Sequence, residues 1–272
     1  MPTNEVDGTS LYHEELGRGP VMLVLHGGPG FDHSYFRPDF DRLSTRTRLV
    51  YLDHRCHGRS GRPPVETFTI EQAADDAAGL LDLLGADRAV VLGHSYGGFI
   101  AQEFALRHPD RLAGLVLVDT TPGQLGSTED PGFDQGPPPP REFVELITDQ
   151  PRSDAEYAAA IPRLIPFYLH RVSWAEVEPR MSGVVFSAEA LVRGMGVLRS
   201  WSSVDRLGEI AAPTLVLVGR HDIPTSRQQS ERIARRIPDA ELVVFEDSGH
   251  FPWWEEPDRF FAVLEGWLDR LP

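Results

Sequence analysis

Short apolar runs alternate with stretches of helical spacing along most of this chain. The runs are Val21–Leu25, Arg48–Leu52, Ala89–Gly93, Leu115–Val118, Thr214–Val218 and Leu242–Phe245. Polar residues do not alternate with apolar ones inside them, which is typical of strands covered on both faces, as in a parallel sheet. The stretches between them, such as Ile70–Leu84 and Asp258–Leu271, repeat apolar residues at helical steps. This alternation predicts the α/β class, with a mostly parallel, doubly wound sheet.

The segment from residue 122 to about residue 206 interrupts the alternation. It contains no clear strand, and helical spacing returns at Glu142–Thr148, Asp154–Leu164 and Ala188–Leu198. A disordered linker is the alternative interpretation, but the aromatic and apolar residues of the segment disfavour it. We therefore predict a core formed by residues 1–121 and 207–272, with an inserted helical cap, or lid, at residues 122–206.

The composition excludes several classes of protein. Acidic residues number 41 and basic residues 26, so the formal net charge is −15, and we predict that the chain binds neither nucleic acid nor a membrane. Cys56 is the one cysteine, which rules out an intramolecular disulfide. The sequence shows no signal peptide and no apolar stretch of about 20 residues, so we predict a cytoplasmic location.

The stretch Gly93-His94-Ser95-Tyr96-Gly97 lies directly after a predicted strand and directly before a predicted helix. A tight turn at such a place holds a serine hydroxyl clear of the edge of the sheet, and glycines two residues away on each side avoid collisions. The motif predicts that Ser95 is a nucleophile. The alternative is an ordinary turn between a strand and a helix.

The stretch His26-Gly27-Gly28-Pro29-Gly30 follows the first apolar run. Glycines allow backbone N–H groups to approach a ligand closely. We predict that the N–H groups of Gly28 and Tyr96 form an oxyanion hole, which stabilises the charged oxygen of a tetrahedral intermediate. The alternative is a turn without a catalytic role.

A serine hydroxyl is a weak nucleophile at neutral pH and needs a base, which a buried carboxylate holds in orientation. Asp222 and His250 follow the last two apolar runs, and the chain order Ser95, Asp222, His250 is the order expected of a serine–acid–histidine triad on a sheet of this type. We predict these three residues as the catalytic triad. Asp119, which directly follows another run, is the alternative acid.

Four histidines suggest a metal cluster at first sight. They are His26, His33, His54 and His57. Zinc ligands are usually more tightly spaced and often include cysteine, and the triad explains catalysis without a metal. We therefore predict no metal site, and we interpret Cys56 as a packed thiol.

Taken together, the stretches Gly93–Gly98, His26–Gly30 and Asp53–Ser60 resemble the proline iminopeptidase branch of the α/β hydrolases. The resemblance extends over Leu11–Pro122 and Leu207–Leu271. It implies the α/β-hydrolase fold with a helical cap, no metal or organic cofactor, and peptide substrates with an N-terminal proline. In that family, acidic residues of the cap and of the loop after the catalytic acid hold the substrate's amine.

The chain departs from the family directly after Asp222, where Ile223 stands in place of the glutamate common in these peptidases. This difference shifts the expectation toward esters, lactones or other amides. The cap carries Glu176 and Glu178, but neither lies in a clear family motif. The predicted substrate contacts from the cap are Glu189, Phe167, Tyr168 and Trp201.

We therefore predict a serine hydrolase that acts through an acyl-enzyme on a small-molecule or short-peptide substrate, an ester, amide or lactone. Two alternatives remain at this point. One is an esterase or lactonase without aminopeptidase activity. The other is a non-catalytic binding protein that kept the fold and lost the chemistry.

Overall fold

A computed structural model describes residues 3–123 and 137–271. Within these residues, one eight-stranded sheet has the order β1-β2-β4-β3-β5-β6-β7-β8. β2 pairs antiparallel with β1 and β4, and all other neighbours are parallel. The strands are β1 (Thr3–Val6), β2 (Thr9–Leu16), β3 (Val21–Leu25), β4 (Arg48–Leu52), β5 (Ala89–His94), β6 (Leu112–Val118), β7 (Thr214–Gly219) and β8 (Glu241–Phe245). The predicted α/β class and the mostly parallel sheet are confirmed.

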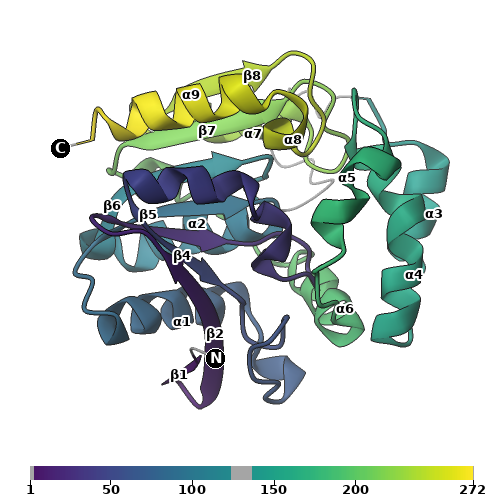
Figure 1. Ribbon diagram of the computed structural model, residues 1–272, viewed down its shortest axis with the longest axis horizontal. Helices are drawn as coiled ribbons and strands as arrows, with labels where there is room; N and C mark the ends of the chain where they lie inside the picture. Colours follow the sequence, from purple (N-terminus) through teal and green to yellow (C-terminus); the bar gives the residue numbers. More distant parts are fainter. Residues whose placement is uncertain (1–2, 124–136, 272) are drawn as a thin grey trace.

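Helices cover both faces of the sheet (Figure 1). α1, α2 and α7 pack on one face, and α9 packs on the other. The helices are α1 (Ile70–Leu83), α2 (Tyr96–Arg107), α3 (Arg141–Thr148), α4 (Asp154–Leu164), α5 (Trp174–Met181), α6 (Ala188–Val197), α7 (Arg227–Arg236), α8 (Pro252–Glu255) and α9 (Pro257–Leu268). None of the helices in the described residues has the length and apolar character needed to cross a membrane.

Strand β3 shows why the apolar runs are continuous. All five of its residues are buried. Leu23 packs into the cluster on the side of α1 and α2, whereas Met22 and Val24 pack into the cluster on the side of α9. Because successive side chains of a strand point to opposite faces, a strand covered on both faces needs apolar residues at every position.

The hairpin of β1 and β2 was not predicted, and it has a different pattern. β2 alternates between buried and partly exposed positions at Thr9, Ser10 and Leu11, and β1 lies at the edge of the sheet, paired on one side only. Such strands carry no continuous apolar run.

Helix α5 was also missed, although Ser173 and Glu176 form a capping box at its start, a signal readable in the sequence.

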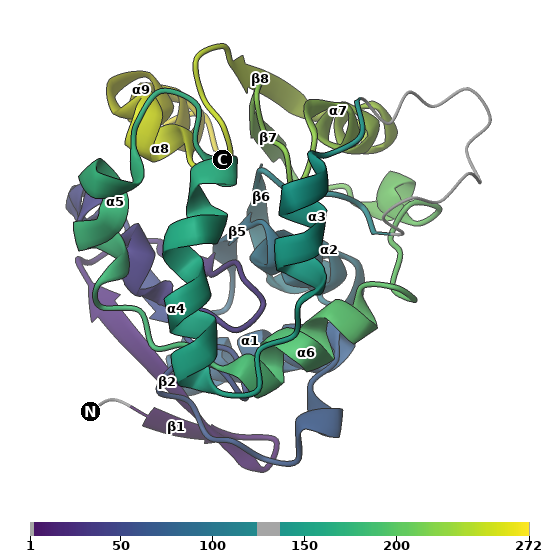
Figure 2. The same cartoon turned by 90° about the vertical axis from the view of Figure 1, so that its right-hand side faces the viewer.

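Helices α3, α4, α5 and α6 all lie between β6 and β7 in the chain and occupy the side of the molecule beyond the carboxyl ends of the parallel strands (Figure 1). Figure 2 looks onto this side, where α3 and α4 run next to each other and α6 crosses below them. We refer to these four helices and their connections as the cap. Its exact boundaries at residues 122 and 206 stay a prediction.

Candidate active site

Ser95 occupies a sharp turn between β5 and α2, with φ 52° and ψ −117°. Its N–H donates a hydrogen bond to the carbonyl oxygen of Val118 in β6, at 2.9 Å. A Cβ atom on Gly93 would lie only 2.3 Å from the carbonyl oxygen of Gly97, so the two glycines permit the close passage of the chain. The turn is the strained strand-to-helix geometry expected for a serine presented above the sheet.

Gly28 faces the same region from the loop after β3. Its φ is +120°, and a Cβ atom there would lie 2.9 Å from the backbone nitrogen of Gly30, so glycine is required. Among the described residues, no hydrogen bond uses the N–H group of Gly28 or that of Tyr96. Tyr96 is the first residue of α2, where a helix leaves its N–H groups unpaired. Both donors therefore remain available to a ligand.

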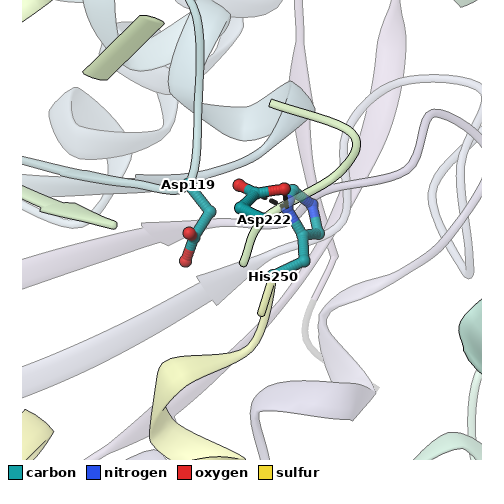
Figure 3. A group of neighbouring side chains, drawn as sticks. All are labelled: Asp119, Asp222 and His250. Carbon is teal, nitrogen blue, oxygen red and sulfur yellow. Dashed lines mark hydrogen bonds and ion pairs between the residues drawn. The ribbon is translucent and has the colours of Figure 1, made fainter. Parts of the chain in front are cut away.

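Asp222 and His250 lie side by side (Figure 3). His250 Nδ1 is 3.0 and 3.1 Å from the two carboxylate oxygens of Asp222. Thr225 donates to the same carboxylate through its N–H, at 3.0 Å, and its hydroxyl, at 2.6 Å. Burial alone would raise the pKa of Asp222, but the charge of His250 and these hydrogen bonds hold it below its usual value. His250 Nε2 is buried and, within the described residues, has no hydrogen-bond partner.

Asp119, the alternative acid, has a different environment. Its Oδ1 accepts a hydrogen bond from the N–H of Gly219, at 2.8 Å, and in the described part of the chain its Oδ2 has no partner. Complete burial, and then the negative charge of Asp222, raises the pKa of Asp119 well above its usual value. A carboxyl group with a raised pKa takes up a negative charge less readily, so it is the poorer partner for an imidazolium. The geometry therefore favours Asp222 as the partner of His250.

One cavity of about 130 Å³ brings the predicted residues together. Its wall includes Ser95, Tyr96, Gly28 and His250, which come from three different loops of the core. Most of the remaining wall is apolar and comes largely from the cap, including Phe143, Leu146, Tyr157, Leu164, Leu191 and Met195. Asp149, at the end of α3, contributes the one carboxylate among the described residues that line the cavity.

The four predicted substrate contacts of the cap lie in different places. Tyr168 lines the cavity, with its ring 5.0 Å from the imidazole of His250. Phe167 packs against Phe143 and is not part of the wall. Trp201 is buried outside the wall, where its Nε1–H donates to Glu103 at 3.0 Å.

Glu189 is exposed and also lies outside the wall. Glu176, Glu178 and Ile223 are not among the residues that line the cavity either. Glu176 accepts a hydrogen bond from the N–H of Ser173 and caps α5, while Glu178 is exposed. Ile223 borders a separate hollow, whose wall also includes Asp222. Among the described residues, therefore, no glutamate lines this cavity as an anchor for a substrate amine of the kind the family resemblance implied.

The histidine group is part of the core. His33 Nδ1 lies 2.5 Å from Asp53, and the rings of His26 and His54 pack 4.1 Å apart. Burial lowers the pKa of His26 and His54 well below the usual value and that of His57 to about 4. His33 differs from these three: burial alone would lower its pKa, but its hydrogen bonds with Asp53 and Glu14 raise the pKa to about 9.

Two further observations concern metal ions and Cys56. Among the described residues, Asp119, Asp222 and His250 are the one group of three or more His, Cys, Asp or Glu side chains that could hold a metal ion. One possible ligand atom from each lies within 4.8 Å of the others. We assign no ion to it, because the hydrogen bond to Asp222 already uses His250 Nδ1. Burial raises the pKa of Cys56 to about 11, so its thiol is not a nucleophile at neutral pH.

The comparisons with known proteins identify the family. Residues 20–257 match the model of the alpha/beta hydrolase fold, so the chain belongs to this family. A proline iminopeptidase of Saccharolobus solfataricus is 26% identical over 293 residues, which cover 97% of this chain and 90% of that protein. The prediction that the chain is a hydrolase similar to proline iminopeptidases is confirmed.

Two solved structures resemble the whole chain. A thermophilic esterase from Thermogutta terrifontis is 30% identical with a TM-score of 0.78, and the match covers 98% of this chain and 96% of that one. An enol-lactonase from Burkholderia xenovorans is 26% identical with a TM-score of 0.80, and the match covers 99% of this chain and all of that one. Similar proteins thus carry names for amide, ester and lactone hydrolysis.

Proposed function

We propose that this chain is a serine hydrolase that acts on a small, uncharged ester with an apolar acyl group. The observation that carries the proposal is the cavity, in which Ser95 and His250 share a wall with mostly apolar and aromatic side chains. Among the described residues that line it, there is no lysine or arginine that would pair with a charged acyl group. Burial of an apolar acyl group stabilises binding by about 0.8 kcal/mol for each methylene group. The similarity to an esterase supports this substrate class.

In the proposed reaction, the hydroxyl oxygen of Ser95 attacks the carbonyl carbon of the ester, and its proton passes to His250 Nε2. Asp222 holds Nδ1–H of the imidazole and stabilises the imidazolium that forms. The tetrahedral intermediate expels the alcohol, which takes the proton from His250. Water then attacks the acyl-enzyme by the same route and releases the acid and free Ser95.

The N–H groups of Gly28 and Tyr96 are proposed to bind the oxygen that becomes negative in this intermediate. Neither has a partner in the described residues, and both belong to the wall of the cavity. Donors fixed by the backbone need no reorganisation when the charge develops, and each is worth about 10²- to 10³-fold in kcat. The start of α2 adds the positive end of a helix dipole.

Ser95→Ala tests this proposal directly. With a neutral butyryl ester, kcat should fall on the order of 10⁴-fold or more, and covalent labelling by a fluorophosphonate should disappear. Ser182→Ala, an exposed serine of the cap, is the matched control and should keep both activity and labelling. Near-normal turnover by a folded Ser95→Ala protein would show that the mechanism is wrong.

An aminopeptidase is the second candidate function, and Asp149 is the observation that favours it. Its exposed carboxylate lines the otherwise mostly apolar cavity, and none of the hydrogen bonds or ion pairs found in the described residues involves its side chain. A carboxylate at this place can pair with a substrate ammonium group. The similarity to a proline iminopeptidase points the same way.

A prolyl arylamide, compared with the same compound acetylated on its amine, separates the two functions. We expect the butyryl ester to have the highest kcat/KM and the two arylamides to be weak and alike. A hundredfold preference for the free amine that is lost in Asp149→Asn would establish the aminopeptidase instead. Glu145→Gln, on the same helix but outside the cavity wall, is the control.

A cytoplasmic location without nucleic-acid or membrane partners stays a prediction from composition.

A further inference from the structure

A continuous chain of hydrogen bonds runs behind the cavity and joins three loops of the proposed site. The N–H of Gly27 donates to the hydroxyl oxygen of Tyr35, at 2.6 Å. The hydroxyl of Tyr35 lies 2.8 Å from His94 Nδ1, and His94 Nε2 lies 3.0 Å from the carbonyl oxygen of His250. Tyr35, His94 and His250 are all buried.

The chemistry of the groups fixes the direction of every bond. A carbonyl oxygen only accepts, so His94 Nε2 carries the proton that points to His250. Burial, and then the charge of His250, keeps the pKa of His94 well below its usual value, so its Nδ1 is an acceptor. Tyr35 must therefore donate to His94, and it accepts from Gly27. Burial raises the pKa of Tyr35 well above its usual value, so its hydroxyl keeps its proton.

This series of hydrogen bonds touches three groups with a proposed catalytic role, and its last member is the carbonyl oxygen of His250 itself. Gly27 precedes Gly28, the proposed oxyanion donor, and His94 precedes Ser95. A Cβ atom on Gly27 would lie 3.0 Å from His94 Nδ1 and 3.1 Å from the Cβ of Ser95, so the two loops are in close contact. The hydroxyl of Tyr35 thus lies where the oxyanion loop, the serine turn and the histidine loop meet.

Aromatic packing holds the ring of Tyr35 in place. Its ring stacks on that of Phe36 with centroids 4.5 Å apart, and Phe251 and Trp253 pack near it at 6.1 and 6.2 Å. Because the hydroxyl already donates one hydrogen bond and accepts another, it has little capacity left for a substrate. Its place in the cavity wall therefore does not make it a catalytic group.

We propose that Tyr35 is a positioning residue, whose hydroxyl sets the distance between the oxyanion loop at Gly28 and the turn that carries Ser95. The proposal rests on the function proposed above. A misplaced oxyanion donor weakens an interaction that is made mainly in the transition state, so its loss lowers kcat and leaves KM nearly unchanged. A residue that only supported the fold would change stability without this selective effect.

Tyr35→Phe removes the oxygen and keeps the ring. Its matched control is Tyr51→Phe on β4, because Tyr51 is fully buried in the same apolar cluster and its hydroxyl donates to Asp41. With a neutral ester, we expect kcat of Tyr35→Phe to fall about tenfold to a hundredfold, with KM changed by less than about twofold. Tyr51→Phe should keep kcat within about twofold. The melting temperatures of Tyr51→Phe and Tyr35→Phe should fall by similar amounts, because each variant loses the hydrogen bonds of one buried hydroxyl.

A second variant keeps the test decisive if Tyr35→Phe proves unstable. His94→Asn interrupts the same series of hydrogen bonds at the residue after Tyr35. The double variant with Tyr35→Phe and His94→Asn should lose no more kcat than the more damaging single variant, because the effects of substitutions within one network are not additive. The inference is wrong if Tyr35→Phe keeps kcat within about twofold of the wild type, or if Tyr51→Phe loses as much kcat as Tyr35→Phe. It is also wrong if the fold-loss of kcat in the double variant equals the product of the two single losses.

Fluorophosphonate labelling separates this inference from the proposed function. If wild-type Ser95 is not labelled, or if Ser95→Ala stays active, the proposed function fails whatever Tyr35 does. If the wild type is labelled and Tyr35→Phe is labelled and turns over at the wild-type rate, only the role of Tyr35 is refuted.

Discussion

Asp119 and Asp222 are two carboxyl groups near one histidine, yet their surroundings shift their pKa values in opposite directions. Asp222 accepts hydrogen bonds from His250 and Thr225, which favour its charged form. Asp119 receives one from Gly219 and is otherwise desolvated beside a negative neighbour. Two carboxyl groups this close rarely ionise together, so the hydrogen bonds decide which one keeps the charge.

The raised pKa of Asp119 has a consequence for stability. Its pKa is raised in the folded protein, whereas in the unfolded chain the group ionises near its usual pKa of about 3.9. Its contribution to stability is therefore greatest below about pH 4. It is lost as the pH rises toward the folded pKa, by at most about 1.4 kcal/mol per pH unit.

Asp119→Asn removes this titration and keeps an oxygen that can accept from Gly219. We expect the melting temperature of the variant to rise relative to the wild type as the pH increases from about 4 to about 8. Thermal melts at several pH values measure the difference. Parallel melting curves over that range would contradict a raised pKa at Asp119.

Asp222 and Asp119 should also differ in how much their substitution lowers kcat. Asp222→Asn should lower kcat on the order of 10⁴-fold, because an amide favours the wrong tautomer of His250. Asp119→Asn should keep most of the activity, since no hydrogen bond joins Asp119 to His250 in the described residues. Steady-state kinetics on a neutral ester compare the two, and a larger loss in Asp119→Asn would reverse the assignment of the acid.

At the scale of elements, the parallel strands could be predicted because each is an apolar run covered on both faces. β3 and β4 match the prediction residue for residue, and β6 begins three residues earlier than expected. The proposed triad could be located because Ser95 follows β5 directly, and Asp222 and His250 lie in the loops after β7 and β8. The contacts of Tyr35 with His94, and of Asp149 with the cavity, could not, because no local pattern records which distant residues the fold brings together.

Helix α4 illustrates how one element serves both the core and the cavity. Leu164 lines the cavity, whereas Ile161, one turn earlier, is buried outside its wall. Leu164→Ala should enlarge the cavity and favour longer acyl chains, by up to about fourfold in relative kcat/KM for each added methylene, equivalent to about 0.8 kcal/mol.

Ile161→Ala is the control for this prediction. It should lower stability by about 2–5 kcal/mol, as is usual for deletion of a buried aliphatic side chain, without changing the preference for acyl length. Ester panels of increasing chain length, with thermal melts of both variants, provide the measurement. If both variants shift the preference equally, α4 affects the cavity through its overall position and not through the side chain of Leu164.

At the scale of the whole molecule, the proposed site lies at one edge of the sheet, between the ends of the parallel strands and the cap. The cap is tied to this edge near Ser95: Tyr157 of α4 donates to the carbonyl oxygen of Pro29, at 2.9 Å, and the N–H of His250 donates to that of Tyr168, at 2.7 Å. The oxyanion loop and the histidine loop are therefore held from the core and from the cap together. A substrate must enter a site surrounded by a molecule of formal net charge −15.

This charge predicts how salt affects different substrates. The field of the molecule should repel an anionic ester and leave a neutral ester unaffected. When ionic strength rises from about 0.01 M to about 0.15 M, the Debye length falls from about 30 Å to about 8 Å, and kcat/KM for a succinyl monoester should rise a few-fold. A neutral butyryl ester should show a flat profile. Asp149→Asn should reduce the slope for the anionic ester, because it removes a carboxylate that lines the cavity. An anionic ester whose kcat/KM falls with salt would instead indicate that a cationic group, and not the overall charge, guides substrates to the cavity.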